Sequence, residues 1–477
     1  MGTSLAKPDL LPPGKIEHAA SGSTIAIEQT AKGMVHTLSE RGLTATYKIR
    51  YQLGGGLMGR TYLVRNGDYL LESPASWFNV YGWDVSPGYN KMAIIDFDRV
   101  MDQQCLSCHT DSVRFADADR RRLKTNDLSA ISCDRCHGPA DDHVRHPAAN
   151  NIINPAKLTG RPRDSVCEQC HLEGITRILN PGKAWSDFQV GRPTETVFAT
   201  YVAHGGNAQD VIAVSQTEQL AQSQCVRATE GKLWCGTCHT VHGEVTDRKE
   251  QIRAVCTNCH VSLSAAAHPA PVSDCIGCHM PRSATTDISH AALTDHRILR
   301  RPIAATPDGQ PLQVRAWSPP PAASAERDWA LAQIVAGFSK QSPALAEDGF
   351  RMLQSLPGEQ RDRDPEVLSD LEGLAVQQGR LDDAAVLGLK IIALQPQSAK
   401  AALNLGIVYK RAGKSAEAEQ QLNRAIEIDP GLKQAYMELA KLYADEQRIQ
   451  DATAVIDRYL KWAPQDIMFR LQRERMN

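Results

Sequence analysis

Twelve of the thirteen cysteines form six C-x-x-C pairs, and a histidine follows each pair directly. Two thiols at this spacing can add to the two vinyl groups on one porphyrin edge, and the adjacent histidine can then bind the iron. The motifs are Cys105-Cys108-His109, Cys133-Cys136-His137, Cys167-Cys170-His171, Cys235-Cys238-His239, Cys256-Cys259-His260 and Cys275-Cys278-His279. We therefore predict six covalent haems c, each with its motif histidine as the proximal iron ligand.

Zinc sites and redox dithiols are the alternative interpretations of a C-x-x-C pair. Structural zinc combines two such pairs, and neither chemistry requires a histidine directly after each pair. The chain has only 15 histidines in 477 residues, yet one stands at each of the six equivalent positions. Chance does not account for this pattern, so haem attachment is the interpretation that it favours.

Nine further histidines could supply the second axial ligand of each iron. His242 lies three residues after His239, and an extended chain covers at most about 3.6 Å per residue, so it cannot reach the opposite face of the same haem. We expect it to serve a neighbouring haem, and His143 to do the same. The predicted distal ligands are His143, His242, His268, His290 and His296, with His18 preferred over His36 as the sixth.

Cys225 is the thirteenth cysteine and lies outside every motif. A free cysteine of this kind is commonly a small buried apolar residue, and we expect it to be buried and unreactive. A thiolate ligand or a reactive thiol is the alternative.

The N-terminal part alternates in the manner of a half-buried strand. In TATYKIRYQL, Ala45 and Ile49 share one face, and Lys48, Arg50 and Gln52 share the other. An Asn-Gly pair at positions 66–67 then predicts a two-residue hairpin turn. We expect a small antiparallel sheet of four or five strands.

The C-terminal part repeats with a period of 34 residues. Prolines recur at 396, 430 and 464, alanines at 384, 418 and 452, and glycines at 379 and 413, with Gln447 at the third glycine position. This period predicts three tetratricopeptide repeats over 365–466 and a degenerate one over 326–360. Such repeats stack helix pairs into a concave surface that binds protein partners.

The predicted fold class is α+β and multidomain. It comprises an N-terminal antiparallel β domain, a mostly helical and loop-rich multihaem core, and an all-α repeat solenoid. The predicted boundaries are 1–100 for the β domain, 101–300 for the hexahaem core, 301–325 for a Pro/Ala-rich linker and 326–477 for the repeats. The linker is expected to keep the folding of the repeats largely separate from the haem core.

Composition restricts the partners and the location. The net charge of −2 and the pI near 6.7 give no overall basic signal for nucleic acid or anionic lipid. No apolar stretch is long enough for a transmembrane segment. The start of the chain lacks the apolar region of a signal peptide, although haem c is attached outside the bacterial cytoplasm. We expect a periplasmic or cell-surface protein whose export signal has been removed.

Several segments resemble a known family. SCDRCHGPADDH, EQCHLEG, SQTEQLAQSQC, LWCGTCHTVHG, CIGCHMP and TDHRI resemble extracytoplasmic multihaem cytochromes with C-terminal tetratricopeptide repeats. These proteins are related to the tetrahaem carrier of ammonia oxidisers and, more distantly, to hydroxylamine oxidoreductase. The resemblance implies bis-histidine haems in stacked and perpendicular pairs, and it implies His143, His242, His268, His290 and His296 as ligands. Many relatives carry a further haem motif near the N-terminus, where this chain has no cysteine.

Three functions are consistent with these features. The first is electron transfer along closely spaced haems, with the repeats docking a redox partner protein. The second is a reductase or oxidase of a small nitrogen or sulfur compound, which needs one iron with an open position. No C-x-x-C-K motif, the mark of the nitrite reductase active site, is present. The third is a haem-containing scaffold or sensor. The sequence leaves open whether copies form a homo-oligomer or a filament.

Overall fold

The computed structural model describes residue 8 and residues 10–54, 58–111, 113–124, 128–204, 212–242, 248–261, 274–288, 290–300 and 312–476. The chain divides into two compact units. Unit 1 contains residues 131–328, and unit 2 contains residues 3–130 together with 329–477. Five of the six C-x-x-C-H motifs therefore lie in unit 1, and the first lies in unit 2. The predicted boundary at 300/301 falls within unit 1, and the division at 328/329 lies close to the predicted start of the repeats.

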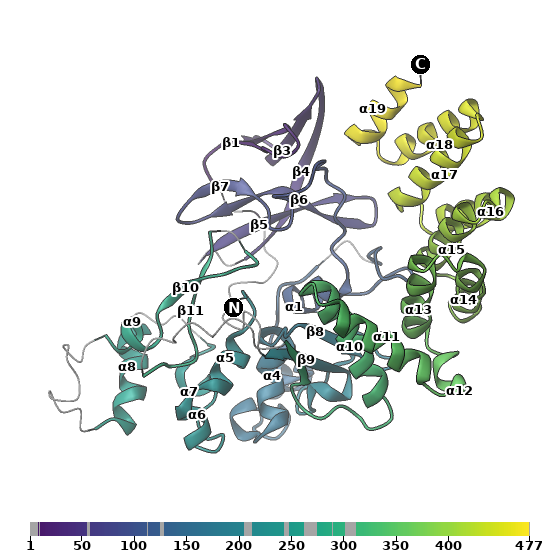
Figure 1. Ribbon diagram of the computed structural model, residues 1–477. Helices are drawn as coiled ribbons and strands as arrows, with labels where there is room; N and C mark the ends of the chain where they lie inside the picture. Colours follow the sequence, from purple (N-terminus) through teal and green to yellow (C-terminus); the bar gives the residue numbers. More distant parts are fainter. Residues whose placement is uncertain are drawn as a thin grey trace. The chain divides into compact units, whose positions relative to one another are not determined.

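The N-terminal part of unit 2 is a seven-stranded antiparallel meander (Figure 1). Its strands, each paired with the next along the chain, are β1 (Gly14–Glu17), β2 (Thr24–Thr30), β3 (Gly33–Glu40), β4 (Leu43–Leu53), β5 (Gly59–Asn66), β6 (Tyr69–Phe78) and β7 (Gly82–Val85). The sheet curls so that its ends approach one another. A Cβ atom on Gly14 of β1 would lie 2.3 Å from the Trp83 indole of β7. Because β1 and β7 have only four residues each, they carry too little alternation to be recognised from the sequence, which predicted four or five strands.

The predicted hairpin and the first part of the predicted alternation are confirmed. Asn66 pairs with Tyr69, so the two turn residues are Gly67, with a φ of 55°, and Asp68, one position later than the predicted pair. Ala45 and Ile49 are buried, whereas Lys48 is exposed. The prediction for Gln52 was wrong, because it is only 4% exposed. A register shift between β4 and β5 follows Ile49, and such a bulge transfers the following side chains to the other face of the strand.

The C-terminal part of unit 2 is an array of antiparallel helix pairs, which confirms the predicted repeats (Figure 1). Its helices are α10 (Ala325–Ser339), α11 (Pro343–Ser355), α12 (Gly358–Arg361), α13 (Pro365–Gln377), α14 (Leu381–Leu394), α15 (Ala399–Arg411), α16 (Ser415–Ile428), α17 (Lys433–Asp445), α18 (Ile449–Trp462) and α19 (Ile467–Arg475). The periodic alanines 384, 418 and 452 are completely buried, because only small residues fit where the two helices of a repeat cross.

The repeats pack against the sheet within unit 2. Ile467 of α19 belongs to the apolar core of the sheet. At the same junction Lys433 Nζ lies 2.8 Å from Asp466, 3.2 Å from Asp98 and 3.4 Å from Asp96. Burial and the neighbouring Asp466 raise the pKa of Asp96 to about 7. The repeats therefore share one folded unit with the N-terminal sheet.

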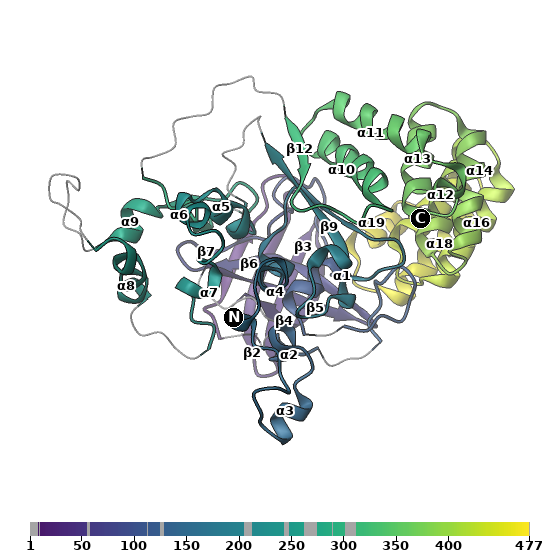
Figure 2. The ribbon, with the colours of Figure 1, turned by 90° about the horizontal axis from the view of Figure 1, so that it is seen from below.

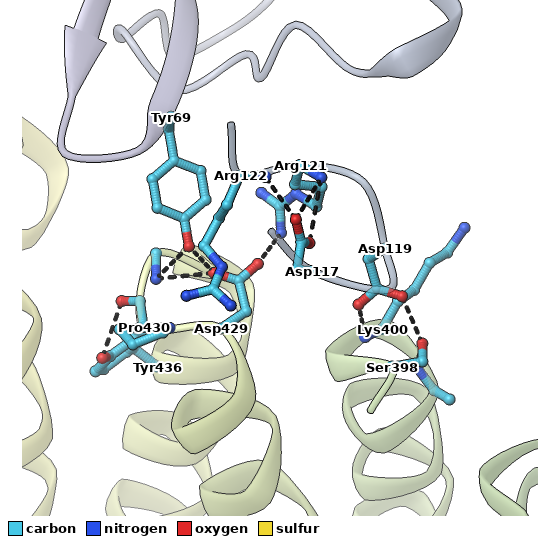
Figure 3. A network of polar contacts seen from close by, with 12 residues as sticks. Tyr69, Asp117, Asp119, Arg121, Arg122, Ser398, Lys400, Asp429, Pro430 and Tyr436 are labelled. Carbon is cyan, nitrogen blue, oxygen red and sulfur yellow. Dashed lines mark hydrogen bonds and ion pairs between the residues drawn. The ribbon is translucent and has the colours of Figure 1, made fainter. Parts of the chain in front are cut away.

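The loop that follows the first cysteine motif also joins the repeats (Figure 3). Asp119 accepts hydrogen bonds from Ser398 Oγ at 2.6 Å and from the Lys400 backbone N–H at 3.0 Å. Arg121 lies 2.9 Å from Asp429 at the end of α16. This loop therefore contacts the turns of two successive repeats, which fixes the segment of the first motif to the repeat array.

Unit 1 consists of short helices, as predicted for the haem core, and of two small sheets that were not predicted. Figure 2 shows several of the helices end-on. The helices are α2 (Asp134–His137), α3 (Asp141–Arg145), α4 (Arg161–His171), α5 (Gln216–Gln222), α6 (Gln224–Ala228), α7 (Cys235–Cys238), α8 (Arg248–Cys259) and α9 (Cys275–His279), with 3-10 turns η1 (Pro155–Lys157), η2 (Trp185–Asp187) and η3 (Thr194–Thr196).

The larger sheet of unit 1 includes part of the predicted linker. Its strand order is β12 (Gln313–Ala316), β9 (Phe198–His204) and β8 (Thr176–Leu179), and a second sheet pairs β10 (Arg282–Ala284) with β11 (Ala292–Thr294). Residues 313–316 are therefore a strand of unit 1, and residues 301–311 of the predicted linker lie outside the described residues. None of the helices in the described ranges combines the length and apolar content of a membrane span.

Candidate haem-binding sites

Each cysteine motif is placed by a short helix. The first lies on α1 (Gln103–His109), where Asp102 accepts hydrogen bonds from the first backbone N–H groups of the helix. The others lie on α2, α4, α7, α8 and α9 or directly beside them. Residues three apart on a helix share one face, so the two thiols of each motif point the same way. The twelve motif cysteines are exposed or half-buried.

Two motif histidines have one ring nitrogen fixed by a backbone carbonyl. The Nδ1 atom of His137 lies 2.7 Å from the carbonyl oxygen of Ile153, and that of His279 lies 2.6 Å from the carbonyl oxygen of Leu299. A carbonyl can only accept, so Nδ1 carries the proton and Nε2 keeps its lone pair for a metal. The residues present therefore fit a haem with a proximal histidine.

Two pairs of histidine rings lie close together in unit 1 with nearly parallel planes. The ring centroids of His137 and His242 are 5.7 Å apart with an interplanar angle of 19°. Those of His239 and His296 are 6.1 Å apart with an angle of 23°. Metal–imidazole bonds are about 2 Å long and a ring centroid lies about 1 Å behind the nitrogen, so two imidazoles on one metal have centroids about 6 Å apart. Both pairs match this separation.

Each pair joins one motif histidine to one predicted distal ligand. His242 is brought to His137 of the second motif, whereas its close neighbour in sequence, His239, is brought to His296. One short stretch thus carries the proximal histidine of one candidate site and the distal histidine of another. Burial lowers the pKa of His296, which favours the neutral ring that a metal requires.

The remaining predicted distal ligands have different surroundings. His143 Nδ1 lies 2.9 Å from Asn151 Oδ1 and 3.2 Å from the Ala148 carbonyl oxygen, which leaves its Nε2 as the metal-binding nitrogen. His290 is exposed, with a φ of 58°. His268 lies outside the described residues. The structure places neither His143 nor His290 opposite a motif histidine among the described ring pairs.

The structure contradicts the choice of His18 as an iron ligand. This side chain is 2% exposed. Its Nδ1 accepts a hydrogen bond from the Ser21 backbone N–H at 3.1 Å, and its Nε2 lies 3.1 Å from the Tyr89 carbonyl oxygen. With both nitrogens engaged inside the sheet, His18 cannot bind iron.

His36, the alternative sixth ligand, is fully buried in the core of the sheet. Its Nδ1 lies 2.7 Å from Ser73 Oγ, and its ring packs edge-on against Tyr62 and Trp83 at 5.3 and 5.5 Å. Burial lowers the pKa of His36 to about 3. Side chains enclose its neutral ring and leave no room for a porphyrin. His36 is therefore a packing residue of the sheet core.

The third and fourth motifs lie side by side. The pKa of the Cys167 thiol is raised first by its hydrogen bond to the Cys235 thiol, then by burial, and further by nearby Cys136. The pKa of Cys235 is lowered by the same hydrogen bond, which it accepts. Arg163 of α4 also stacks on Trp234 at 5.0 Å. The second, third and fourth motifs are therefore neighbours.

The last three motifs also lie close to one another. Burial, together with nearby Cys275 and Cys238, raises the pKa of Cys256 to about 11. The fourth, fifth and sixth motifs are therefore also neighbours.

Cys225 lies close to the motif cysteines of unit 1. It is half-buried, so the burial expected for it is only partial. Its charge contributes to the raised pKa of Cys238, after burial and Cys235. Cys225 therefore lies beside the fourth motif.

Glu168 and Trp317 are site residues that the sequence analysis missed. Glu168 directly follows Cys167 and is only 2% exposed. Its carboxylate lies 2.6 Å from the Arg161 guanidinium and accepts a hydrogen bond from Trp317 Nε1 at 3.0 Å. Burial raises the pKa of Glu168, while Arg161 and Trp317 oppose the shift. A tryptophan within a Pro/Ala-rich segment was the available signal that this segment is anchored to the core.

Two family models match parts of the chain. Residues 86–138 match the family described as cytochrome c554 and c-prime, and this range contains the first two motifs. Residues 375–431 and 412–473 match the tetratricopeptide repeat. The matches support a c-type cytochrome that carries tetratricopeptide repeats, with covalent haem c as its cofactor.

Similarity to individual proteins is confined to part of the chain. Human protein O-mannosyl-transferase TMTC1 is 30% identical over 101 residues, which are 21% of this chain. The chain spans only 12% of the length of that curated relative. Among solved structures, the Arabidopsis OM64 TPR domain is 20% identical, with 24% of this chain and 93% of that chain covered and a TM-score of 0.22. Pseudomonas aeruginosa pilF is 23% identical, with 28% and 60% covered and a TM-score of 0.24.

Proposed function

We propose that this protein is an extracytoplasmic hexahaem c-type cytochrome that transfers electrons along closely spaced bis-histidine haems. Haem, when bound, supplies an iron that takes up and releases one electron. The observation that carries the proposal is the pairing of His137 with His242 and of His239 with His296 at a separation suited to one metal. Two strong axial ligands leave no position for a substrate, which favours electron transfer over catalysis at these sites.

The contacts between motif helices would set the haem spacing. The thiol contact between Cys167 and Cys235 supports short separations between neighbouring haems. Arg163 binds the Gly231 carbonyl oxygen at 2.9 Å and stacks on Trp234, so it holds α4 beside the fourth motif. The chain would thereby keep five haems in one series.

The repeats would dock a protein partner that gives or receives electrons. The family match supports a protein-interaction role for this region. Asp119 and Arg121, which follow the first motif, bind the turns of two repeats. A partner held by the repeats would therefore be held by the unit that carries the first motif.

The proposal is tested by haem content and spin state. Mass spectrometry of the denatured protein should give the mass of the chain plus six haems, and a smaller number would contradict the hexahaem assignment. His242→Ala and His296→Ala should each convert one low-spin haem to a high-spin haem in electron paramagnetic resonance spectra. His146→Ala, an exposed histidine of the same unit, is the matched control and should leave the spectra unchanged. Unchanged spectra in both ligand variants would overturn the pairing.

A second candidate function is reduction or oxidation of a small nitrogen or sulfur compound at the first motif. The histidines of unit 2 are His18, His36 and His109, and the first two are committed to the sheet. Unit 2 therefore offers no distal histidine for an iron bound by His109. An iron without that ligand has the open position that catalysis requires.

A further inference from the structure

Glu72 of β6 carries a buried carboxyl group that electron transfer along the haems does not by itself require. The residue is 8% exposed. Arg99 Nη1 lies 3.1 Å from one of its carboxylate oxygens, but the Arg99 side chain is 41% exposed. Solvent therefore screens the positive charge of this ion pair more than the negative charge. The ion pair compensates the buried carboxylate only in part.

Residues 99–101 attach the first cysteine motif to the sheet. The Met101 backbone N–H donates a hydrogen bond to the Leu70 carbonyl oxygen at 2.8 Å, and Val100 forms a β-bridge with Leu71. The helix of the first motif, α1, begins two residues after Met101. This segment therefore fixes the first motif directly beside β6.

The Glu72 side chain lies on the face of the sheet that α1 covers. Glu72 pairs with Leu63 across the antiparallel strands β6 and β5, and directly paired residues share one face. Leu63 belongs to one apolar cluster with Leu70 and with Leu106 of α1. Leu70 precedes Glu72 by two positions on β6 and therefore shares the same face. The Glu72 carboxyl consequently lies between the sheet and the helix of the first motif.

Several ionisable groups surround this carboxyl. Asp102 and Glu72 both interact electrostatically with the sulfur of Cys105, which cannot titrate once it is bonded to haem. The Tyr89 hydroxyl donates a hydrogen bond to the Glu72 carbonyl oxygen at 3.1 Å, and burial raises the pKa of Tyr89. Burial also raises the pKa of Glu72, to about 7, although Arg99 opposes the shift. Glu72 therefore changes its charge near neutral pH, whereas Tyr89 stays neutral and Arg99 stays charged.

We propose that Glu72 binds a proton when the haem attached to Cys105 and Cys108 is reduced. The proposal rests on the proposed function, which assigns a haem c to this motif. One electron from the redox partner protein reduces ferric iron to ferrous iron, and the Glu72 carboxylate takes one proton from the solvent to become a carboxylic acid. The added electron makes the surroundings more negative, so proton binding by a nearby carboxylate becomes more favourable. Oxidation reverses both transfers.

The test is a redox titration of the full-length, haem-loaded protein at a series of pH values around 7. The contribution of the first haem is the difference between the unmodified protein and Cys105→Ala/Cys108→Ala. Its midpoint potential should fall as the pH rises through about 7 and become constant at higher pH, where Glu72 is ionised in both redox states. A charge about 10 Å from an electron acceptor changes the equilibrium constant for reduction by roughly tenfold, or about 59 mV for one electron.

Glu72→Gln should remove this pH dependence and keep the first haem at the higher potential, because the variant has no carboxylate charge at any pH. Glu28→Gln, a substitution at an exposed glutamate of β2, is the matched control and should keep the pH profile of the unmodified protein. Infrared difference spectra should show the carbonyl band of a protonated carboxyl on reduction, and this band should be missing from Glu72→Gln. An unchanged pH profile in Glu72→Gln would overturn the proposal.

Arg99→Gln provides a second variant, which keeps the carboxyl and removes the neighbouring cation. Because Arg99 lowers the pKa of Glu72, the pH range over which the potential falls should move upward. A purely structural ion pair would affect stability and leave this range where it is, which would count against the proposal. Mass spectrometry of the denatured protein distinguishes the two failures. A first haem that is present but has a pH-independent potential refutes this inference alone, whereas a missing first haem refutes the hexahaem assignment as well.

Discussion

Tyr69 of the sheet donates a hydrogen bond to Asp429 of the repeats, 360 residues further along the chain (Figure 3). Both side chains are buried, and the pKa of Tyr69 is raised first by burial and then by this bond. Asp429 also lies 2.9 Å from Arg121 in the loop after the first motif. One carboxylate therefore joins the sheet, the repeats and the segment of the first candidate haem site.

Tyr69→Phe should destabilise unit 2. The substitution keeps the ring but removes the hydroxyl, so Asp429 loses one of its buried hydrogen bonds at a cost of about 1–2 kcal/mol. Urea unfolding followed by circular dichroism measures the change. Tyr81→Phe is the control, because Tyr81 is 63% exposed, and it should leave the free energy of unfolding nearly unchanged. Equal effects of the two substitutions would show that the buried hydrogen bond contributes nothing.

On the second candidate function, the haem attached to Cys105 and Cys108 should bind carbon monoxide in the reduced protein, whereas six bis-histidine haems should bind none. His109 is the histidine of this motif, and the two other histidines of unit 2, His18 and His36, are held in the sheet. We expect carbon monoxide to bind to about one haem in six in difference spectra, as an open axial position requires.

Cys105→Ala/Cys108→Ala should abolish this carbon monoxide signal and reduce the haem count by one. The corresponding substitution in the second motif, Cys133→Ala/Cys136→Ala, should also remove one haem but keep the signal. If no carbon monoxide binds to the unmodified protein, all six irons carry two protein ligands and the enzymatic alternative fails.

Gln447→Gly should stabilise the repeats. Gln447 has a φ of 63° at the position where the two preceding repeats have Gly379 and Gly413, with φ values of 73° and 72°. A residue with a side chain pays about 1–2 kcal/mol to adopt a left-handed conformation, and glycine avoids this cost. Glycine is also more flexible in the unfolded chain, which offsets part of the gain. We expect a gain of about 1 kcal/mol in thermal or urea unfolding. Gly413→Ala should have the opposite effect, and a loss of stability in Gln447→Gly would contradict the argument.

The stability of the repeats should depend on the ionisation of Glu372. This residue of α13 is 3% exposed, and burial raises the pKa of its carboxyl from 4.5 to about 7. Because the folded-state pKa is raised, the folded state is favoured at low pH, and stability falls as the pH rises from about 4.5 to above 7. This pKa shift corresponds to a change of roughly 3 kcal/mol at most in the free energy of unfolding.

Glu372→Gln should remove this part of the pH dependence and stabilise the protein above pH 7. Urea unfolding at a series of pH values measures the effect. Glu427→Gln, a substitution at an exposed glutamate of α16, is the matched control and should keep the dependence of the unmodified protein. A pH profile that is the same in all three proteins would refute the role of Glu372.

Local patterns were sufficient to predict several features. The hairpin depends on a turn of two residues, Gly67 and Asp68, and the helical repeats depend on a short-range period that each helix pair satisfies with its neighbours. The alternation in β4 could be predicted only up to Ile49, because the bulge that turns Gln52 inward depends on the pairing with β5. The attachment of β12 to unit 1 likewise depends on a partner strand more than 100 residues earlier.

The sequence by itself determined where haem can be attached, because two thiols and a histidine within five residues contain all the chemistry of that step. Only the tertiary structure decided which distal histidine faces which motif. His242 is three residues from His239 and 105 residues from His137, yet its ring centroid lies 5.7 Å from that of His137. It also decided that His18 belongs to the sheet, since its partner Tyr89 lies 71 residues away. A ligand pair across a metal needs two groups on opposite sides, and only the folding of distant segments can bring them there.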